Sequence, residues 1–215
     1  MIKIAPSIIA ANILKIESEV KKVDEAGADY IHIDIMDGHY VPNITFGPRT
    51  VETLRALTNK ILDVHLMISP VLKHIEKFTK AGADIISFHP EADLEPLKVI
   101  NLIRNLNCKP GIAIHPNVAI SEIETYLSLV DIVIVMTVIP GQGGQQFMND
   151  QIMKISLLKN LRDKNNLNYE IEVDGGINKD NSKICRANGA DVLVSGSYIY
   201  DSHHTKYKNL IEYLR

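Results

Sequence analysis

The stretch AGADYIHIDIM at residues 26–36 carries the two signals that decide the fold. Its glycine suits the C-terminal cap of a helix, and the β-branched run that follows at once suits a buried strand. The same junction recurs as AGAD at 81–84 and as NGAD at 188–191. The chain is therefore expected to repeat a unit in which a helix gives way to a strand.

Eight short β-branched runs are spaced along the chain, and each predicts a strand. They are IKIAPS (2–7), YIHIDIM (30–36), ILDVHLM (61–67), DIISFH (84–89), KPGIAIH (109–115), DIVIVM (131–136), YEIEVD (169–174) and DVLVSG (191–196). The segments between them have apolar residues three or four apart, which indicates helices throughout. Two such sets are Ile13, Ile16, Val20 and Val23, and Ile152, Ile155, Leu158 and Leu161.

Apolar strands that alternate with amphipathic helices indicate an α/β protein with a parallel sheet covered by helices. Eight such units in 215 residues indicate a closed barrel. We expect a single (β/α)8 TIM barrel, with residues 1–215 forming one domain. The alternative is an open doubly wound sheet, but no GxGxxG fingerprint follows the first run, which leads into Pro6 and Ser7.

Composition argues against several classes of function. The net charge is −3 and no basic block is present, so nucleic acid is not an expected partner. The isolated Cys108 and Cys185 are expected to be reduced, structural thiols. Pro6, Ser7 and Asn12 interrupt the apolar N-terminus, which argues against a signal peptide, and no apolar run reaches the roughly 18 to 20 residues of a membrane span. We expect a soluble, cytoplasmic protein without a membrane partner.

Polar residues at the ends of the predicted strands are the candidates for chemistry, because active sites of such barrels gather there. His32 and Asp34 lie two apart on one strand, His65 ends the next, and Asp174 ends the seventh. Singly, each residue is explained equally well as hydrogen-bonded core or as a helix cap. Four such groups buried together must pair or coordinate a cation. Two histidines and two aspartates suit zinc, iron, manganese or cobalt better than calcium.

Three methionines, Met36, Met67 and Met136, fall at the same ends of their strands. Two roles suit them equally. They fill gaps in the core, or they wall the reacting carbon with proton-inert thioethers that keep water from a reactive intermediate.

Glycine clusters follow the sixth, seventh and eighth predicted strands. They are PGQGG at 140–144, Gly175 with Gly176, and Gly196 with Ser197. Turns need glycine anyway, but three clusters at one end of a barrel favour a phosphate site. No Lys or Arg lies in residues 137–147, so backbone amides are expected to hold the anion.

A divalent cation beside a phosphate site, with two carboxylates and no lysine at these strand ends, indicates proton abstraction next to a carbonyl. One carboxylate removes the proton from one face, and the other returns a proton to the opposite face. The centre is inverted without a redox cofactor. The predicted reaction is therefore an epimerisation.

The chain closely resembles the ribulose-phosphate 3-epimerases, from APSIIAAN at 5–12 to VSGSYIY at 194–200. The most specific stretches are HIDIMDGHYVPNITFGP, DVHLM, FHPEA, VMTVIPGQGGQQF and EVDGGIN. The resemblance implies a barrel of the ribulose-phosphate-binding type with one divalent metal ion and no organic cofactor. It further implies interconversion of D-ribulose 5-phosphate and D-xylulose 5-phosphate in the pentose phosphate pathway by a homo-oligomer.

The same resemblance assigns roles to particular residues. It makes His32, Asp34, His65 and Asp174 the metal ligands, with Asp34 and Asp174 as the acid and base pair. Met36, Met67 and Met136 match the methionine wall of the family. The implied substrate contacts are Ser7, His65, Gly141, Gln142, Gly143, Gly144, Gly175, Gly176, Gly196 and Ser197.

Three residues depart from the pattern of the family. Where the family usually reads NPGFGGQ, this chain reads IPGQGGQ, so Ile139 and Gln142 replace an asparagine and a phenylalanine. His115 stands where the family usually has asparagine before Pro116. These changes leave the reaction type intact but open the choice of substrate. One alternative is that the substrate is D-allulose 6-phosphate. Another is that the chain is a specialised copy of the enzyme that serves sugar biosynthesis.

Two other classes of protein suit the sequence less well. Decarboxylases and synthases of related barrels typically carry a lysine beside the acids of the second strand, which here reads HIDIMD. A barrel that only senses a sugar phosphate is expected to have a damaged ligand set, and all four candidate ligands are present.

Overall fold

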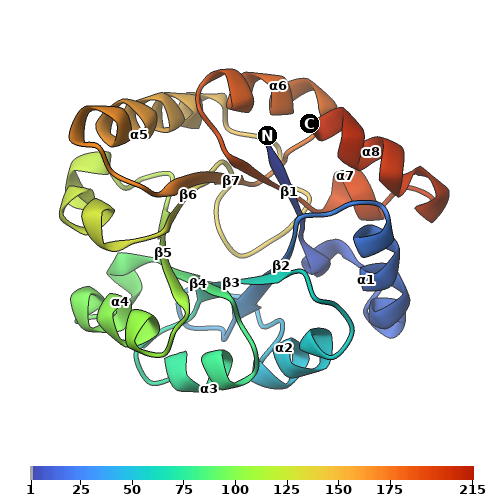
Figure 1. Ribbon diagram of the computed structural model, residues 1–215, viewed down its shortest axis with the longest axis horizontal. Coiled ribbons are helices and arrows are strands. Elements are labelled where there is room, and N and C mark those ends of the chain that lie inside the picture. The colour runs from blue at the N-terminus through green and yellow to red at the C-terminus, as the bar shows by residue number, and fades with distance from the viewer. Residues whose placement is uncertain (1) are drawn as a thin grey trace.

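The computed structural model describes residues 2–215, and its centre is a ring of eight parallel strands (Figure 1). The strands are β1 (Lys3–Pro6), β2 (Tyr30–Met36), β3 (Ile61–Met67), β4 (Ile85–Phe88), β5 (Lys109–Ile114), β6 (Ile132–Met136), β7 (Glu170–Asp174) and β8 (Val192–Ser195). From β2 to β8 each strand pairs with the next one along the sequence, and β8 pairs with β1. A parallel bridge between Ser7 and His32 joins β1 to β2. The predicted (β/α)8 barrel is confirmed.

Helices follow the strands and surround the ring (Figure 1). The α-helices are α1 (Ile16–Glu25), α2 (Pro48–Arg55), α3 (Ile75–Lys80), α4 (Pro96–Asn105), α5 (Ile152–Asn165), α6 (Lys179–Ala187), α7 (Ser197–Tyr200) and α8 (Tyr207–Leu214). Short 3-10 helices are η1 (Ile8–Ala10), η2 (Ile13–Lys15), η3 (Pro90–Ala92), η4 (Ile120–Glu122), η5 (Glu124–Leu129), η6 (Asn149–Gln151) and η7 (His204–Lys206).

The expectation of an α-helix between every pair of strands is wrong at one place. Between β5 and β6 the chain forms only the 3-10 helices η4 and η5. Ile120, Ile123 and Leu127 are nevertheless buried, because 3-10 turns also bring residues three apart onto one face. Ile13 is a second difference, since it precedes α1 in η2 and its side chain is 58% exposed.

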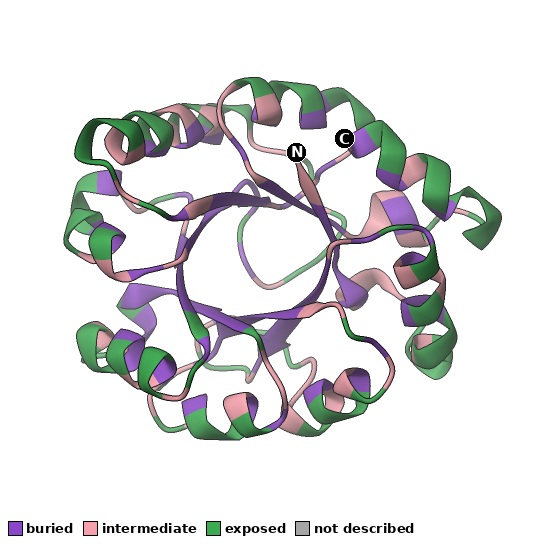
Figure 2. Cartoon of the chain, in the orientation of Figure 1, coloured by how far each residue is buried: buried purple, intermediate pink, exposed green. Residues whose placement is uncertain are grey.

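The barrel strands are buried on both faces (Figure 2), because outward side chains pack on the helices and inward side chains fill the barrel. All seven residues of β2 are buried. Ile31 and Ile33 belong to the core shared with the helices, whereas the alternating His32 and Asp34 lie on the inner face. Polar residues at the inward positions of an apolar strand therefore lie in the barrel interior.

The glycines of the repeated junctions end their helices in left-handed conformations, as the sequence predicts. The φ angles are +96° at Gly27, +103° at Gly82 and +111° at Gly189. An L side chain is strained in this region of φ, which explains glycine at each position.

The aspartate after each of these glycines has a role that the motif alone does not indicate. Its carboxylate accepts the main-chain N–H of the second residue of a neighbouring strand and faces an arginine. The N–H bonds run to Asp29 from Ile4, to Asp84 from Leu62 and to Asp191 from Ile171, each at 2.8 Å. The facing arginines are Arg215, Arg55 and Arg162, in the same order. These contacts tie strands together at the end of the barrel where the strands begin.

Two further features bear on the class of protein. Within residues 2–215, none of the helices combines the length and the apolar character that a membrane crossing requires. Cys108 and Cys185 are free and buried, which agrees with structural thiols.

Candidate active site

Four ionisable side chains meet inside the barrel near the C-terminal ends of the strands. Asp34 on β2 and His65 on β3 are neighbours in the sheet register. His32 lies one inward position earlier on β2, and Asp174 is the last residue of β7. One nitrogen or oxygen atom from each lies within 4.8 Å of the other three. The structure thus brings together the four residues that the sequence predicts as ligands.

Two imidazole nitrogens face the carboxylates without forming hydrogen bonds to them. His32 Nε2 lies 3.4 Å from Asp34 Oδ1 and 3.8 Å from Asp174 Oδ2. His65 Nδ1 lies 3.5 and 3.7 Å from the same two oxygens. Both nitrogens are buried and have no hydrogen-bond partner. These unpaired buried nitrogens belong to a group of residues that could hold a metal ion, whereas buried polar atoms usually have partners.

Opposite charges within this cluster stabilise the charged forms of Asp34, His32 and His65. Burial lowers the pKa of His65, but the carboxylates of Asp174 and Asp34 outweigh that effect and raise the pKa to about 9. Burial also opposes charge on His32, yet Asp34 and Asp63 raise the pKa of this imidazole well above its ordinary value. Burial raises the pKa of Asp34, but His32 and His65 hold it well below the usual range. Asp34 therefore stays ionised, and positive charge is favoured beside it.

A second layer of buried acids lies behind His32. The Nδ1 atom of His32 is 2.6 Å from Asp63 Oδ2 and 3.3 Å from Glu172 Oε1. Burial and the charge of Asp63 raise the pKa of Glu172 to about 8, so Glu172 is mostly protonated at neutral pH. Asp63 therefore accepts the Nδ1–H of His32, and Nε2 is left facing the cluster.

These two acids were not singled out from the sequence, although a signal for them exists. Asp63 precedes His65 by two residues on β3, and Glu172 precedes Asp174 by two on β7. Side chains two apart on a strand share a face. The alternation that directs His65 and Asp174 into the barrel therefore also directs these acids inward, one layer deeper.

Behind His65 lies a cluster from the segment HPEA at 89–92, whose contribution the sequence left open. The Nε2 atoms of His65 and His89 are 3.1 Å apart, and both side chains are fully buried. Tyr40 stacks on the His89 ring with centroids 4.7 Å apart. Tyr40 Oη donates to Glu91 Oε1 at 2.8 Å. Burial lowers the pKa of His89 to about 4, so this imidazole is neutral at physiological pH.

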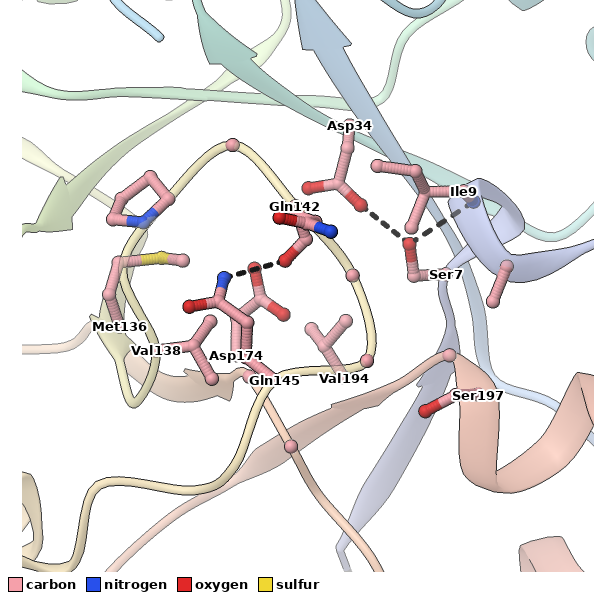
Figure 3. Close-up of a pocket in the computed structure, with 18 of the residues that line it drawn as sticks. Ser7, Ile9, Asp34, Met136, Val138, Gln142, Gln145, Asp174, Val194 and Ser197 are labelled. Atoms are coloured by element: carbon pink, nitrogen blue, oxygen red, sulfur yellow. Dashed lines mark hydrogen bonds between the residues drawn. The ribbon is translucent and has the colours of Figure 1, made fainter. Parts of the chain in front are cut away.

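An open cavity, with about 570 Å³ of empty space that includes open solvent, is lined by two of the four ionisable residues, Asp34 and Asp174 (Figure 3). Asp34 and Asp174 reach it from β2 and β7, with Ser7 beside Asp34, whereas His32 and His65 do not line it. The sequence-predicted residues that line it are Ser7, Asp34, Met36, Met67, Met136, Gly141, Gln142, Gly143, Gly144, Asp174, Gly175, Gly176, Gly196 and Ser197.

The glycine clusters form one side of this cavity, and no Lys or Arg lines it. A Cβ atom on Gly176, whose φ is +64°, would lie 2.8 Å from Phe147 N and 2.9 Å from Gln145 O. A Cβ atom on Gly175 would lie 2.5 Å from Val138. The backbone here approaches its neighbours as closely as only glycine permits.

The loop between β6 and η6 is held by side chains that the sequence did not single out. Gln145 Nε2 donates to the carbonyl oxygens of Ile139 at 2.6 Å and Gln142 at 2.7 Å, the latter drawn in Figure 3. Asn43 Nδ2 donates to the Gly141 oxygen at 2.9 Å. The loop that carries glycines 141, 143 and 144 is therefore fixed from both of its sides.

The three departures from the family pattern lie in two places. Gln142 lines the cavity itself. Ile139 and His115 instead border a neighbouring open groove, together with Tyr40 and Glu91. Only one of the three departures is thus in position to meet a molecule in the cavity.

The fold and the site together define a class of protein. A (β/α)8 barrel whose strand ends carry paired carboxylates over buried histidines has its polar residues where barrel enzymes have their active sites.

Comparison with known proteins identifies the family. Residues 3–200 match the ribulose-phosphate 3 epimerase family. The chain is 44% identical to a ribulose-phosphate 3-epimerase of Bacillus subtilis over 96% of this chain and 95% of the relative. It is 43% identical to a ribulose-phosphate 3-epimerase of Synechocystis over 94% of this chain and 88% of the relative. The chain belongs to the ribulose-phosphate 3-epimerase family and is an epimerase.

Solved structures with low sequence identity share the fold. A 3-keto-L-gulonate-6-phosphate decarboxylase from Vibrio cholerae superposes with a TM-score of 0.72 at 17% identity. That match covers 100% of this chain and 95% of the decarboxylase. At this identity the likeness supports the barrel and nothing finer.

Proposed function

We propose that this epimerase interconverts D-ribulose 5-phosphate and D-xylulose 5-phosphate by moving a proton at C3. The observation that carries the proposal is the pair of carboxylates, Asp34 and Asp174, which reach one cavity from different sides of the barrel. The names of the curated relatives support the choice of substrate.

In the direction in which Asp34 is the base, its carboxylate takes the proton as the C3–H bond breaks. The electron pair of that bond forms a C2–C3 double bond, and the carbonyl electrons move to O2. Asp174, protonated at the outset, then gives its proton to the opposite face of C3 while the carbonyl re-forms. The reverse reaction exchanges the two roles. Only the configuration at C3 changes, so the scheme needs no oxidant, reductant or organic cofactor.

We propose that His32, Asp34, His65 and Asp174 hold one divalent ion of zinc, iron, manganese or cobalt. The unpaired His32 Nε2 and His65 Nδ1 support this proposal, because each faces both carboxylates from a buried position. When bound, such an ion supplies positive charge for the oxygen atoms of the substrate on which negative charge develops.

The remaining residues of the cavity position the substrate and exclude water. Ser7 donates to Asp34 and fixes the orientation of that carboxylate. Met36, Met67 and Met136 present thioethers that neither donate nor accept protons at the reacting carbon. We assign phosphate binding to the backbone of Gly141 to Gly144, Gly175, Gly176, Gly196 and Ser197, because the cavity lining has no cationic side chain.

A second substrate, D-allulose 6-phosphate, is supported by Gln142. This side chain lines the cavity where the family resemblance leads one to expect phenylalanine. An amide offers hydrogen bonds that an aromatic ring does not, and an additional hydroxyl group could use them.

The experiment that tests the proposal measures turnover of purified, metal-reconstituted protein on both sugar phosphates, with a chelated sample as control. Fast, chelator-sensitive conversion of D-ribulose 5-phosphate supports the proposal. Preference for D-allulose 6-phosphate would make that compound the proposed substrate. Metal binding without turnover of either compound contradicts catalysis and points to a binding role.

We propose that residues 1–215 form one barrel domain, that the protein is cytoplasmic and that it assembles as a homo-oligomer. Sedimentation of the purified protein tests the assembly, because a single species of monomer mass contradicts it.

A further inference from the structure

The side of His65 that faces away from the carboxylates contacts a second buried histidine. His65 Nε2 and His89 Nε2 lie 3.1 Å apart, within hydrogen-bonding distance. His89 directly follows β4, and its side chain has no solvent exposure. The ring of His65 is therefore flanked by carboxylates on its Nδ1 side and by an imidazole on its Nε2 side.

Two Nε2 atoms at this distance must share one hydrogen, because two lone pairs or two N–H groups would repel each other. His65 Nδ1 faces Asp34 and Asp174 at 3.5 and 3.7 Å. If Nδ1 is to offer a lone pair to a cation, the hydrogen of the neutral ring must be on Nε2. His65 then donates to His89, and the His89 Nε2 atom has no hydrogen.

The surroundings of His89 suit the tautomer that this arrangement requires. With Nε2 as acceptor, the hydrogen of His89 must lie on Nδ1, and Nδ1 is 3.7 Å from Glu91 Oε1. Tyr40 holds both partners, since its ring stacks on His89 and its hydroxyl group donates to Glu91. A carboxylate on the Nδ1 side and an imidazole on the Nε2 side both favour hydrogen on Nδ1 of His89.

We propose that His89 is a positioning residue, which accepts the Nε2–H of His65 and so keeps His65 Nδ1 directed at Asp34 and Asp174. His89 then does for the second histidine of the cluster what Asp63 does for His32. An outer partner that fixes ring orientation and tautomer is a general requirement of ligating histidines. The role of His89 in metal binding rests on the proposed metal site, but the hydrogen bond between the two histidines does not.

The first test measures the side-chain nitrogen shifts of His89 by NMR in the full-length, metal-free protein. The expected result is a hydrogen on Nδ1 and a hydrogen-bonded, unprotonated Nε2. His89 accepts from His65 whether His65 is neutral or charged, so this result does not depend on metal binding. A hydrogen on His89 Nε2 would overturn the proposal.

The second test measures cobalt affinity by competition with a chelator, using His89→Phe and His89→Gln. His89→Phe keeps a ring for Tyr40 to stack on but removes the acceptor, and we expect it to weaken cobalt binding by roughly 10- to 100-fold. His89→Gln retains an acceptor oxygen and is expected to recover part of that loss. The matched control is His115→Phe, whose ring lies 6.5 Å from His89 and does not contact His65.

Each outcome of the second test decides a separate point. Unchanged cobalt affinity in a folded His89→Phe protein, or His89→Gln no better than His89→Phe, overturns the positioning role. A shifted visible spectrum of the bound cobalt in His89→Phe supports it, because a loss of general stability alone would not alter the ligand field. If the wild-type protein binds no cobalt, the proposed metal site fails, and the NMR test still decides the histidine pair.

Discussion

The hydroxyl group of Ser7 donates a hydrogen bond of 2.5 Å to Oδ2 of Asp34 across the seam where β1 meets β2. The parallel bridge between Ser7 and His32 lies in the same seam. Ser7 is itself fixed, since its Oγ also accepts the N–H of Ile9 at 3.4 Å. The contact that joins the two ends of the sheet thus also orients the proposed base.

Replacing Ser7 by alanine should lower turnover while the barrel persists. The variant loses a hydrogen bond to an ionised group, which is worth roughly 1.5–3 kcal/mol. If the bond orients Asp34 in the transition state, kcat on D-ribulose 5-phosphate should fall by about 10- to 100-fold. The control is Ser69→Ala, because Ser69 Oγ bonds only to the Ala92 carbonyl oxygen and does not line the cavity. Equal kcat values for the two variants would contradict an orienting role of Ser7.

The two-carboxylate mechanism predicts that neither Asp34→Asn nor Asp174→Asn is tolerated. Each change removes a proton carrier and a metal ligand together, so we expect turnover to drop by several orders of magnitude, on the order of 10²–10⁴-fold or more. The amide keeps the shape of the carboxylate, and circular dichroism should show an intact fold. Near-normal activity in either folded variant, with metal present in excess, would rule the mechanism out.

The sequence predicts the barrel because local patterns and the global fold agree. Three of the helix-to-strand junctions carry a glycine with positive φ, and each strand has its own β-branched run, so no long-range contact is needed to recognise the unit. The segment between β5 and β6 escaped prediction because residues three and four apart are buried in 3-10 turns as in α-helices.

The sequence predicts the residues around the cavity better than the residues behind them. His32 and Asp34 stand out because they interrupt an apolar strand at its C-terminal end. Asp63 obeys the same alternation, but its meaning depends on register with His32 across two strands. The contact between His65 and His89 depends on ring orientation in three dimensions, which no spacing along the chain reports.

Metal removal should destabilise the protein as well as inactivate it. The four proposed ligands are gathered only in the folded state, so a bound ion would add roughly 2.7 kcal/mol of stability at one hundred times its dissociation constant. For a domain of this size that corresponds to a rise in Tm of about 5–10 °C. Thermal unfolding with and without added manganese or cobalt after chelation measures it. An unchanged Tm with excess metal, or an equal rise in Asp34→Asn, would argue against this site.

Gly176→Ala should impair substrate binding more than it impairs folding. The new Cβ atom would lie 2.8 Å from Phe147 N, so the loop that carries the glycines has to move. Because this backbone is the proposed phosphate site, we expect KM to rise by roughly 10- to 100-fold. Gly27→Ala is the matched control, since its φ is also positive at +96° but nothing lies within 4 Å of the new atom. That variant should lose about 1 kcal/mol of stability and keep its KM. Equal KM values for both variants would show that Gly176 does not belong to the binding site.

Glu19→Gln should lower stability at neutral pH and reduce its dependence on pH. Glu19 is 8% exposed, and its Oε2 accepts the hydroxyl hydrogen of Tyr207 on α8 at 2.6 Å. Burial raises the pKa of Glu19, but the hydrogen bonds from Tyr207 and Lys22 outweigh this and hold the pKa below its ordinary 4.5. The folded state therefore favours the ionised form. The resulting stability is fully present above pH 4.5 and is lost as the pH falls through the lower folded-state value.

For the Glu19 carboxylate we expect Glu19→Gln to cost about 1 kcal/mol at neutral pH, and the free-energy gap to the wild type to narrow at low pH, as Glu19 takes up a proton in the folded state too. Urea unfolding at the two pH values measures the difference. Glu25→Gln, at the exposed end of the same helix, is the control and should match the wild type at both. A constant gap between Glu19→Gln and the wild type would mean that packing of α8 on α1, and not the charge on Glu19, accounts for the loss, because packing does not titrate in this range.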